Sequence, residues 1–411
     1  MKLYVWVGIG LVAGLLLGMV AAITGSEFLT AVAVGIEPIG TAFVNLLKMV
    51  VIPLIVVIIF VGVGNLGDLR RLGQLGTLTL LFFAVTSAIG VLIGMGVMQL
   101  MLPMANEAAA QAITPESAVP PELPGIVEFL LSLIPSNPFQ AAAEGALLPL
   151  IVFTILVAAA TGALPERERD ILLALAQAVS AALVKLVHWI LLLAPVGVFA
   201  LAAPVAARTG WAMLQSLGAF ILAVFIGLLV FFSAVYLPLV RFVGRMPVGL
   251  FLKASANPII IAGTTASSAA SVPAMLEAAE RDLRLSNSAT SIVIPLGAGL
   301  GRSGSALFQG AGIVFLAWLF GVPLAASAVG GAVLATFIVS FTVAGIPAGG
   351  VFSLAPALGT VGVPLDGLGI LLGVDRLPDM GRTATNVAGI MAAAVVLNRV
   401  STSDDDLPPS G

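Results

Sequence analysis

Four polar residues near the C-terminal end share one face of an otherwise apolar segment. They are Asp375, Asp379, Arg382 and Asn386 in DGLGILLGVDRLPDMGRTATNVAGIMAAAVVLNRV, with Thr383 at their border. A helix turns by roughly 100° per residue, which places the four on a stripe about 60° wide. An arginine can bind a carboxylate through two parallel hydrogen bonds, an aspartate can accept from an ammonium group, and an asparagine can hold a second carboxylate. The stripe therefore predicts a binding site for an acidic amino acid; the alternative is an internal ion pair between Asp379 and Arg382 that only fixes helix packing.

The chain that carries this stripe has the composition of a polytopic membrane protein. Its 411 residues are 60% hydrophobic and only 9% charged, with a mean hydropathy of +1.17, whereas soluble domains carry about 25% charged residues. Stretches long enough to cross a hydrocarbon core of about 30 Å lie at 4–24, 43–63, 77–102, 171–207 and 213–240. Because backbone groups in lipid must bond to one another, we expect helices. The first stretch is longer than a signal-peptide core and is interpreted as a retained helix.

Loop charges predict the orientation of these spans. Lys and Arg in short loops stay on the cytoplasmic side, and here they occur in every second connection, with Arg208 as the one exception. The intervening connections 25–38 and 103–124 contain Glu but no Lys or Arg. We expect a multi-pass protein of the cell inner (plasma) membrane with both termini cytoplasmic. The basic loop residues are Lys2, Arg70, Arg71, Arg167, Arg169, Arg241 and Arg245.

After residue 245 the apolar segments become short and interrupted. Segment 248–284 is basic near both ends around a Ser/Ala/Gly/Pro tip, so it should enter and leave from the cytoplasmic side. Segment 325–364 has the tip AGIPAGG and no Lys or Arg, so it should dip in from the outside. Paired broken segments indicate inverted repeats with a substrate site near the membrane midplane; two ordinary helical pairs are the alternative.

A second intramembrane cation, Arg302, lies in GAGLGRSGSALFQG, residues 297–310. GLGRSG matches the dinucleotide-binding pattern G-x-G-x-x-G, but that reading needs an acidic residue about 20 positions further on, and the next acid is Asp366. We interpret the glycines as residues that let a helix unwind inside the membrane.

The sequence offers little for other functional classes. There is no cysteine, and the single histidine, His188, lies in VKLVHWILLL, where a packed role is expected. Asp375 and Asp379 share one helix, whereas an acid–base pair would more plausibly come from two. No acidic ring or repeated filter indicates a channel, and no basic patch indicates nucleic acid. We expect no enzymatic activity, no cofactor and no resident metal.

At these segments the chain resembles the dicarboxylate/amino acid:cation symporter family, the glutamate transporter homologues. The most specific matches are SSAASVP in the first hairpin, AGIPAGG in the second and DMGRTATNV in the last helix. The resemblance implies an all-α fold of eight transmembrane helices plus two re-entrant helical hairpins in inverted repeats. It also implies a homotrimer in which a transport domain moves like an elevator against a rigid scaffold in the lipid bilayer.

The resemblance also divides the chain into domains. Segments 1–76 and 104–212 would form the scaffold and trimerisation domain. Segments 77–103 and 213–399 would form the transport domain, which includes both hairpins as gates. Residues 400–411, STSDDDLPPSG after Val400, would be a cytoplasmic tail.

Individual binding roles follow from the same resemblance. Arg382 matches the residue that binds the substrate's side-chain carboxylate, and Asp379 the one that binds its amino group. Asn386 and Ser268 match positions that hold the main-chain carboxylate. Because dicarboxylate-specific relatives lack an acid at the position of Asp379, its presence favours an amino acid over succinate or malate. The remaining pocket residues implied are Thr383, Ser305, Ile346 and Gly350.

The sequence departs from the family where sodium-coupled relatives bind their ions. They read Asn-Met-Asp-Gly-Thr where this chain reads GRSGS, so Gly301, Arg302 and Ser303 replace the Asn, Met and Asp. In the last helix, Ile390 replaces a sodium-binding aspartate. In the third helix, Thr86 and Ser87 keep the sodium-ligand pattern, but Phe83 replaces the tyrosine before them.

These departures predict a loss of sodium coupling, because Na⁺ requires oxygen ligands and a guanidinium repels it. We hypothesise that Arg302 is a tethered cation that offsets Asp375 and Asp379, with Asp375 as its partner; the alternative is an Arg302 that merely reaches a cytoplasmic cavity. Proton coupling, substrate exchange and passive elevator movement all stay open. The alternative functions are a C4-dicarboxylate transporter, or a sodium symporter that uses only the residual positions Thr86 and Ser87.

Overall fold

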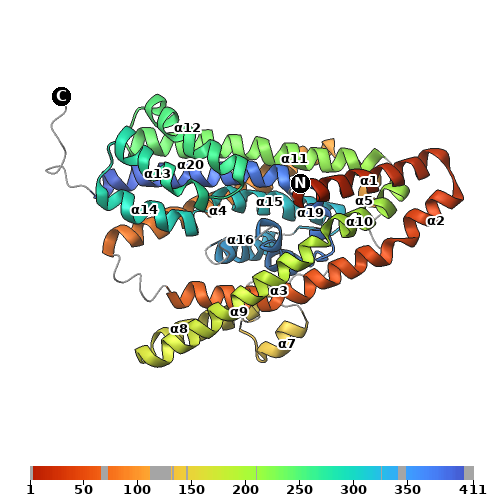
Figure 1. Ribbon diagram of the computed structural model, residues 1–411, viewed down its shortest axis with the longest axis horizontal. Helices are drawn as coiled ribbons and strands as arrows, with labels where there is room; N and C mark the ends of the chain where they lie inside the picture. Colours follow the sequence, from red (N-terminus) through yellow and green to blue (C-terminus); the bar gives the residue numbers. More distant parts are fainter. Residues whose placement is uncertain are drawn as a thin grey trace.

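The computed structural model describes the chain as an all-helical protein (Figure 1). The described residues are 3–65, 73–111, 131, 134–144, 147–209, 211–324, 326–340 and 349–401, and no strand occurs within them. Six helical spans in these ranges are long and apolar enough to cross a membrane: Trp6–Thr24, Glu27–Leu46, Leu75–Met104, Glu166–Leu192, Trp211–Val243 and Arg376–Val400. The predicted all-α, multi-pass class is therefore confirmed, while the count of eight transmembrane helices and the elevator architecture stay predictions.

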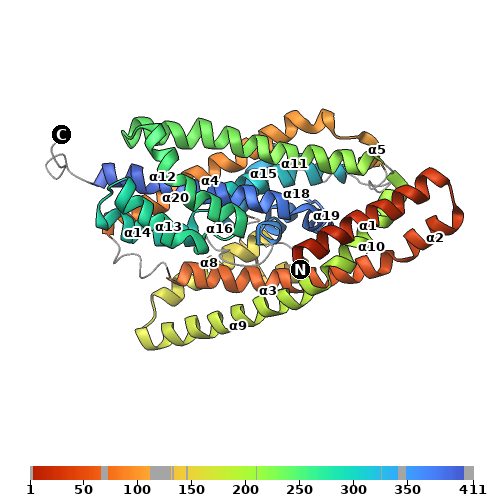
Figure 2. The same cartoon turned by 45° about the horizontal axis from the view of Figure 1, so that its top comes forward.

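One group of helices comes mainly from the first half of the chain. The helix α1 (Leu3–Thr24) packs along α10 (Ala194–Thr209), and α3 (Glu37–Asn65) packs along α9 (Glu166–Leu192), as Figures 1 and 2 show. The stretch 171–207, expected to be apolar throughout, is divided between α9 and α10 at Leu193, just before Pro195. The other members are α2 (Glu27–Gly35), α7 (Pro138–Ala143) and α8 (Leu147–Gly162).

Glycines let α1 and α10 approach closely. Gly10, Gly14 and Gly18 lie four residues apart on one face of α1, and a Cβ built on Gly14 would lie 2.6 Å from the carbonyl oxygen of Phe199. Small residues at this spacing are a common basis of helix packing in membranes. The pair therefore forms a closely packed unit.

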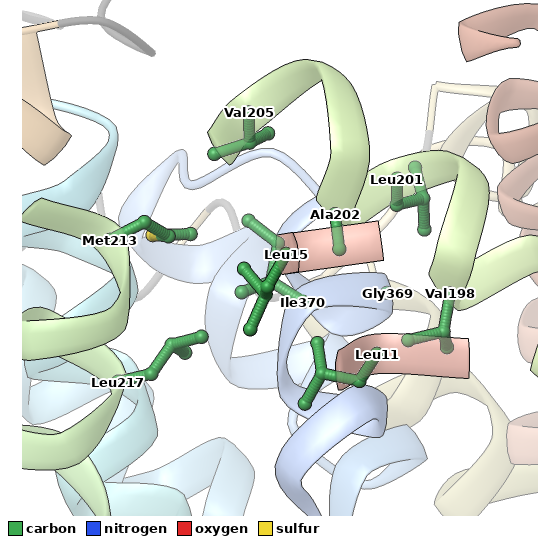
Figure 3. Close-up of a pocket in the computed structure, with 10 residues that line it drawn as sticks. All are labelled: Leu11, Leu15, Val198, Leu201, Ala202, Val205, Met213, Leu217, Gly369 and Ile370. Carbon is green, nitrogen blue, oxygen red and sulfur yellow. The ribbon is translucent and has the colours of Figure 1, made fainter. Parts of the chain in front are cut away.

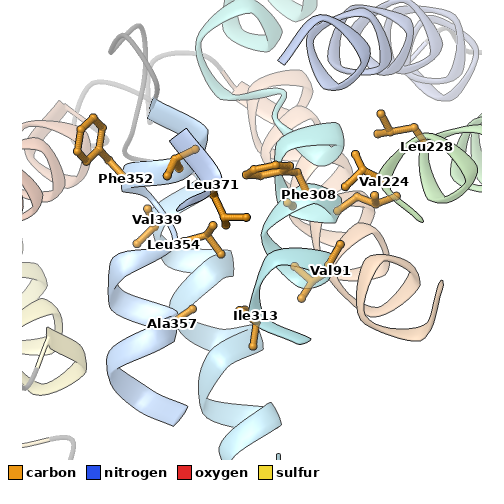
Figure 4. Close-up of a cluster of buried hydrophobic side chains, with 14 of the residues drawn as sticks. Val91, Val224, Leu228, Phe308, Ile313, Val339, Phe352, Leu354, Ala357 and Leu371 are labelled. Carbon is orange, nitrogen blue, oxygen red and sulfur yellow. The ribbon is translucent and has the colours of Figure 1, made fainter. Parts of the chain in front are cut away.

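The second group surrounds α15 (Ser303–Leu319), a helix buried almost throughout. A helix that is hydrophobic on every side belongs in an interior, and α4 (Gly73–Met101), α11 (Trp211–Phe231), α16 (Ala326–Ser340) and α20 (Arg376–Ser401) all pack against it. Figure 4 shows side chains of α4, α11, α15, α16, α18 and α19 gathered into one apolar cluster. This packing fixes the position of the α15 N-terminus.

The first expected hairpin segment, 248–284, folds back on itself. The helix α12 (Val248–Thr265) ends at Ala266, which has a φ of 51°, and the chain returns through η5 (Ala269–Ser271), α13 (Val272–Glu277) and η6 (Ala278–Asp282). Both α13 and η6 contact α12, and α12 packs along α20. The C-terminal end of α12 thereby lies beside α20, where Arg376 Nη2 donates to the carbonyl of Thr264 at 3.5 Å.

The second expected hairpin segment, 325–364, contains α16, α17 (Gly349–Phe352) and α18 (Ala355–Val361), and α16 packs against α18. Residues 341–348, which include Ile346 and most of AGIPAGG, lie outside the described residues. Further elements are η2 (Leu102–Met104), α5 (Glu107–Gln111), η3 (Phe232–Tyr236), η4 (Leu239–Val243), α14 (Asn287–Leu300) and α19 (Gly367–Val374).

The two groups meet at an apolar pocket of about 320 Å³. Leu15 of α1 and Leu201 of α10 face Leu217 of α11 and Ile370 of α19 across it (Figure 3). The pocket lies at the boundary of the predicted scaffold and transport domains, and that division stays a prediction.

Candidate functional site

The polar stripe of the last segment continues across a break between two helices. Pro378 has no N–H to donate to the carbonyl of Val374, and α19 ends at Val374 while α20 begins at Arg376. The linking residue Asp375 nevertheless keeps helical angles (φ −56°, ψ −30°), and its carbonyl accepts from the N–H of Asp379 at 2.8 Å. The helical spacing therefore continues through the break.

Arg382 forms a buried ion-pair cluster with both aspartates. Its Nη1 donates to Asp375 Oδ1 at 2.7 Å and its Nη2 to Asp375 Oδ2 at 3.3 Å, while its Nε donates to Asp379 Oδ1 at 3.0 Å. The Arg382 and Asp375 side chains are 3% and 7% exposed, whereas that of Asp379 is 19% exposed. The expectation that Asp375 pairs with Arg302 is wrong, because its carboxylate is held by Arg382 in a bidentate pair along the same helix.

Two elements outside α20 hold the Arg382 guanidinium in place. Its Cζ lies 4.6 Å from the centre of the Phe308 ring, a distance suited to a cation–π contact. On another side, a Cβ built on Gly350 would lie only 2.5 Å from Nη1 and 2.6 Å from Nη2. Only glycine permits this approach of backbone to the guanidinium, so α17 and α15 both touch the charged group.

Asn386 caps the N-terminus of α15. Its Oδ1 accepts from the N–H groups of Gly304 at 2.8 Å and Ser305 at 3.3 Å, and its Nδ2 donates to Ser305 Oγ at 3.1 Å. The first N–H groups of a helix need outside acceptors, and Arg302, in the N-cap position, has no capping side-chain bond. Asn386 supplies the acceptor from α20 and thereby connects the two helices.

The chain between α14 and α15 is interrupted at Gly301 and Arg302, as the sequence predicts. Arg302 is only partly exposed, and its Nε is enclosed without a hydrogen-bond partner. Within the described part of the chain, it forms no ion pair with any carboxylate. Its side chain instead enters a pocket beside Arg382.

That pocket is small in this structure and lies between α15, α16 and α17. It contains Ser305 and Gly350, both predicted to contact substrate, together with Gln309 and Ser353, which the sequence reasoning missed. Gln309 is spaced four residues from Ser305 and seven from Arg302, so all three share one face of α15; that spacing was the available signal. The lining residues are Arg302, Ser305, Gln309, Val339, Gly349, Gly350 and Ser353.

The structure does not bring every expected residue into contact with this cluster. Ser268 lies at the turn after α12, where its carbonyl accepts from Ser271, and its side chain makes no hydrogen bond to any described residue. Thr383 is buried on α20 beside Arg382. Ile346 falls outside the described residues. The binding roles of all these residues stay predictions.

Apolar atoms pack where sodium-coupled relatives are expected to place oxygen ligands. A Cβ built on Gly301 would lie 2.9 Å from Phe83 Cε1 and 3.0 Å from Ile390 Cγ1. Phe83 and Ile390 are 1% and 0% exposed. The positions that replace a Tyr and an Asp thus both place apolar side-chain atoms beside Gly301, the position that replaces an Asn, next to the carbonyl oxygen of Gly297.

The residual sodium-site hydroxyls bond to protein groups. Thr86 Oγ1 donates to the carbonyl of Phe82 at 2.8 Å and lies 2.9 Å from Ser303 Oγ, which is 3.4 Å from Ser87 Oγ. The structure therefore brings Thr86 and Ser87 together with Ser303, the residue at the missing aspartate position. This cluster contains three hydroxyls and no carboxylate.

Comparison with known proteins agrees with this arrangement. Residues 3–400 match the model of the Sodium:dicarboxylate symporter family. The chain belongs to this family. The Sodium:dicarboxylate symporter family consists of transporters and not of enzymes, so the expectation of no enzymatic activity is confirmed.

Three relatives in the Sodium:dicarboxylate symporter family illustrate its range. The chain is 33% identical over 370 residues to the proton/glutamate-aspartate symporter of Escherichia coli (strain K12), covering 88% of this chain and 84% of the relative. It is 31% identical over 399 residues to the proton/sodium-glutamate symport protein of Bacillus caldotenax (95% and 92%). It is 30% identical over 404 residues to a C4-dicarboxylate transport protein of Anaeromyxobacter sp. (strain K) (97% and 89%).

Proposed function

We propose that this protein is a secondary active transporter that carries aspartate or glutamate across the inner membrane without sodium. Relatives named as glutamate/aspartate symporters and as C4-dicarboxylate transport proteins support an acidic amino acid or dicarboxylate as substrate. An elevator movement of a homotrimer, and coupling to protons or exchange of substrates, complete the proposal. Asp375, which is buried, and Asp379, which is partly exposed, are the carboxyl groups of the Arg382 cluster that a transported proton could reach.

The observation that carries the choice of an amino acid is the contrast between the two aspartates. Asp375 uses both oxygens on Arg382, so it serves as the fixed counterion. Asp379 contacts Arg382 through Oδ1 alone and is the more exposed of the two. Its Oδ2 is therefore able to accept a charge-assisted hydrogen bond from a substrate ammonium group.

Sodium independence rests on packing and on charge. The side chains of Phe83 and Ile390 beside Gly301 supply no oxygen ligand, and a hard cation has little affinity for hydrocarbon. One guanidinium with two carboxylates leaves an excess negative charge in the Arg382 cluster. Arg302, which lies within electrostatic range of Asp379, offsets that charge without a bound ion.

The substrate class is tested by uptake into liposomes. Radiolabelled aspartate, glutamate and succinate are offered to the wild type and to Asp379→Asn. We expect aspartate and glutamate uptake by the wild type, and a selective loss of both in the variant, because the amide cannot replace a carboxylate as partner of an ammonium group. Wild-type uptake of succinate alone would overturn the amino-acid proposal and establish the dicarboxylate alternative.

A further inference from the structure

The pocket beside Arg382 contains two buried polar atoms that have no hydrogen-bond partner among the described residues. One is the Nε of the Arg302 guanidinium. Arg302 lies in range of the like charge of Arg382 as well as of the opposite charge of Asp379, and it forms no ion pair with a described residue. A partly enclosed cation without a paired anion is suited to an anion supplied by a ligand.

The second group is the carbonyl oxygen of the Gln309 side chain. Gln309 is 2% exposed, and its Nε2 donates to Ser353 Oγ. Ser353 Oγ donates in turn to the carbonyl of Gly350 at 2.9 Å, which fixes the Gln309 amide with its nitrogen toward Ser353. Among the described residues, Gln309 Oε1 is then left as a buried acceptor with no partner, and such a group requires a donor.

Two of the groups expected to bind the substrate carboxylates, Asn386 for the main chain and Arg382 for the side chain, are engaged within the protein. The Asn386 amide caps α15 and bonds Ser305. Arg382 directs its Nε, Nη1 and Nη2 to the two aspartates. Arg302 is the pocket arginine whose donors carry no bond to a described residue, and it lies at the N-terminus of α15, where the helix dipole also favours an anion.

We propose that Arg302 and Gln309 bind the transported substrate directly. Arg302 binds the carboxylate next to the α-substituent, and Gln309 Oε1 accepts a hydrogen bond from the α-ammonium or α-hydroxyl group. This inference rests on the proposed function and moves the main-chain carboxylate from Asn386 to Arg302. It defines the substrate class as dicarboxylic acids with a donor on the α-carbon, so that aspartate and malate are favoured over succinate.

The test measures the KM of liposome uptake for aspartate, malate and succinate in three variants. Arg302→Met should raise the KM for all three ligands by about tenfold or more, the effect of losing a charged hydrogen-bonded contact. Arg302→Lys should recover only part of that loss, because an ammonium cannot reproduce the planar fork. Gln309→Leu should raise the KM for aspartate and malate and leave that for succinate unchanged.

Matched controls separate binding from folding. Arg208→Met removes an exposed arginine that pairs with Glu37 at 2.9 Å, and Gln215→Leu removes an exposed glutamine on α11; both should keep the wild-type KM. The melting temperature of each variant is measured alone and with aspartate, and the Arg302 and Gln309 variants should lose the shift that aspartate produces in the wild type.

The outcomes distinguish this inference from the proposed function. Full recovery by Arg302→Lys with an unchanged preference among the three ligands would overturn direct binding, because a charge-balancing role needs only a cation. An equal effect of Gln309→Leu on succinate and aspartate would overturn the role of Gln309. If the wild type takes up succinate alone, the amino-acid function fails, and an unchanged succinate KM in Arg302→Met then overturns the role of Arg302. Uptake of none of the three by the wild type would overturn both.

Discussion

Arg382 Nη1 and Asp375 Oδ1 lie 2.7 Å apart, in side chains that are 3% and 7% exposed. The second hydrogen bond, from Nη2 to Oδ2, makes the pair bidentate. Asp375 is therefore the structural partner of Arg382, and Asp379 is the acid left to meet a ligand. The first prediction rests on these different roles of Asp375 and Asp379.

Asp375→Asn should destabilise the protein strongly. The substitution leaves the buried guanidinium of Arg382 paired with Asp379 alone. Breaking a buried ion pair costs about 3–5 kcal/mol of folding free energy. The measurement is the melting temperature in detergent. As a control, Asp170→Asn removes an acid from the exposed pair with Arg169, whose side chains are 65% and 25% exposed, and should change the melting temperature little. A wild-type melting temperature in Asp375→Asn would contradict the account.

Gly350→Ala should abolish aspartate binding, because the added methyl would lie 2.6 Å from Arg382 Nη2. The guanidinium would have to leave Asp375, or α17 would have to move away from it. Binding is measured by titration calorimetry. Gly218→Ala is the matched control, since no atom of the described residues lies within 4 Å of a methyl added there. Equal affinities of the two variants for aspartate would show that the close approach of Gly350 to Arg382 has no role in binding.

Ile390→Asp should lower the melting temperature, and sodium should not restore it. The position is 0% exposed and borders Phe83 and Gly301, so a carboxylate there would be buried without a partner. Melting is compared in sodium chloride and choline chloride at equal ionic strength, with the wild type beside it. If the melting temperature recovered in sodium chloride but not in choline chloride, a set of oxygen ligands for a cation would have to remain around Thr86 and Ser87.

A mercury cross-link between Leu201→Cys and Gly369→Cys should arrest transport. A Cβ built on Gly369 would lie 2.7 Å from Leu201 Cδ1, and the two residues come from the predicted scaffold and transport domains. The chain has no native cysteine, so each single variant serves as a clean control. Uptake should fall on addition of Hg²⁺ in the double variant alone and return with excess thiol. Undiminished uptake by the cross-linked protein would exclude sliding at this interface.

The parts of the site that lie on one helix could be predicted from the sequence. Helical geometry fixes the spacing of Asp375, Asp379, Arg382 and Asn386. This spacing continues even through the break before Pro378. The interruption at Arg302 could also be predicted, because Gly301 precedes it in a segment otherwise too apolar for a loop.

The contacts between helices could not be predicted in this way. Whether Asp375 pairs with Arg302 or with Arg382 depends on where α15 and α20 lie relative to each other. In the structure, Asp375 pairs with Arg382, the partner that is near in the sequence. The capping of α15 by Asn386 joins residues 82 positions apart. Gln309 was not predicted as a site residue, because a single amide in an apolar helix indicates a site only once its contact with Ser353 is known.

The central claim is that aspartate transport proceeds without sodium, and the most direct measurement is the initial rate of radiolabelled aspartate uptake into liposomes in sodium chloride and in choline chloride. Both solutions have the same ionic strength and the same pH gradient. The account predicts equal rates in the two salts, and a loss of uptake in both for Asp379→Asn. Uptake in sodium chloride alone would contradict it.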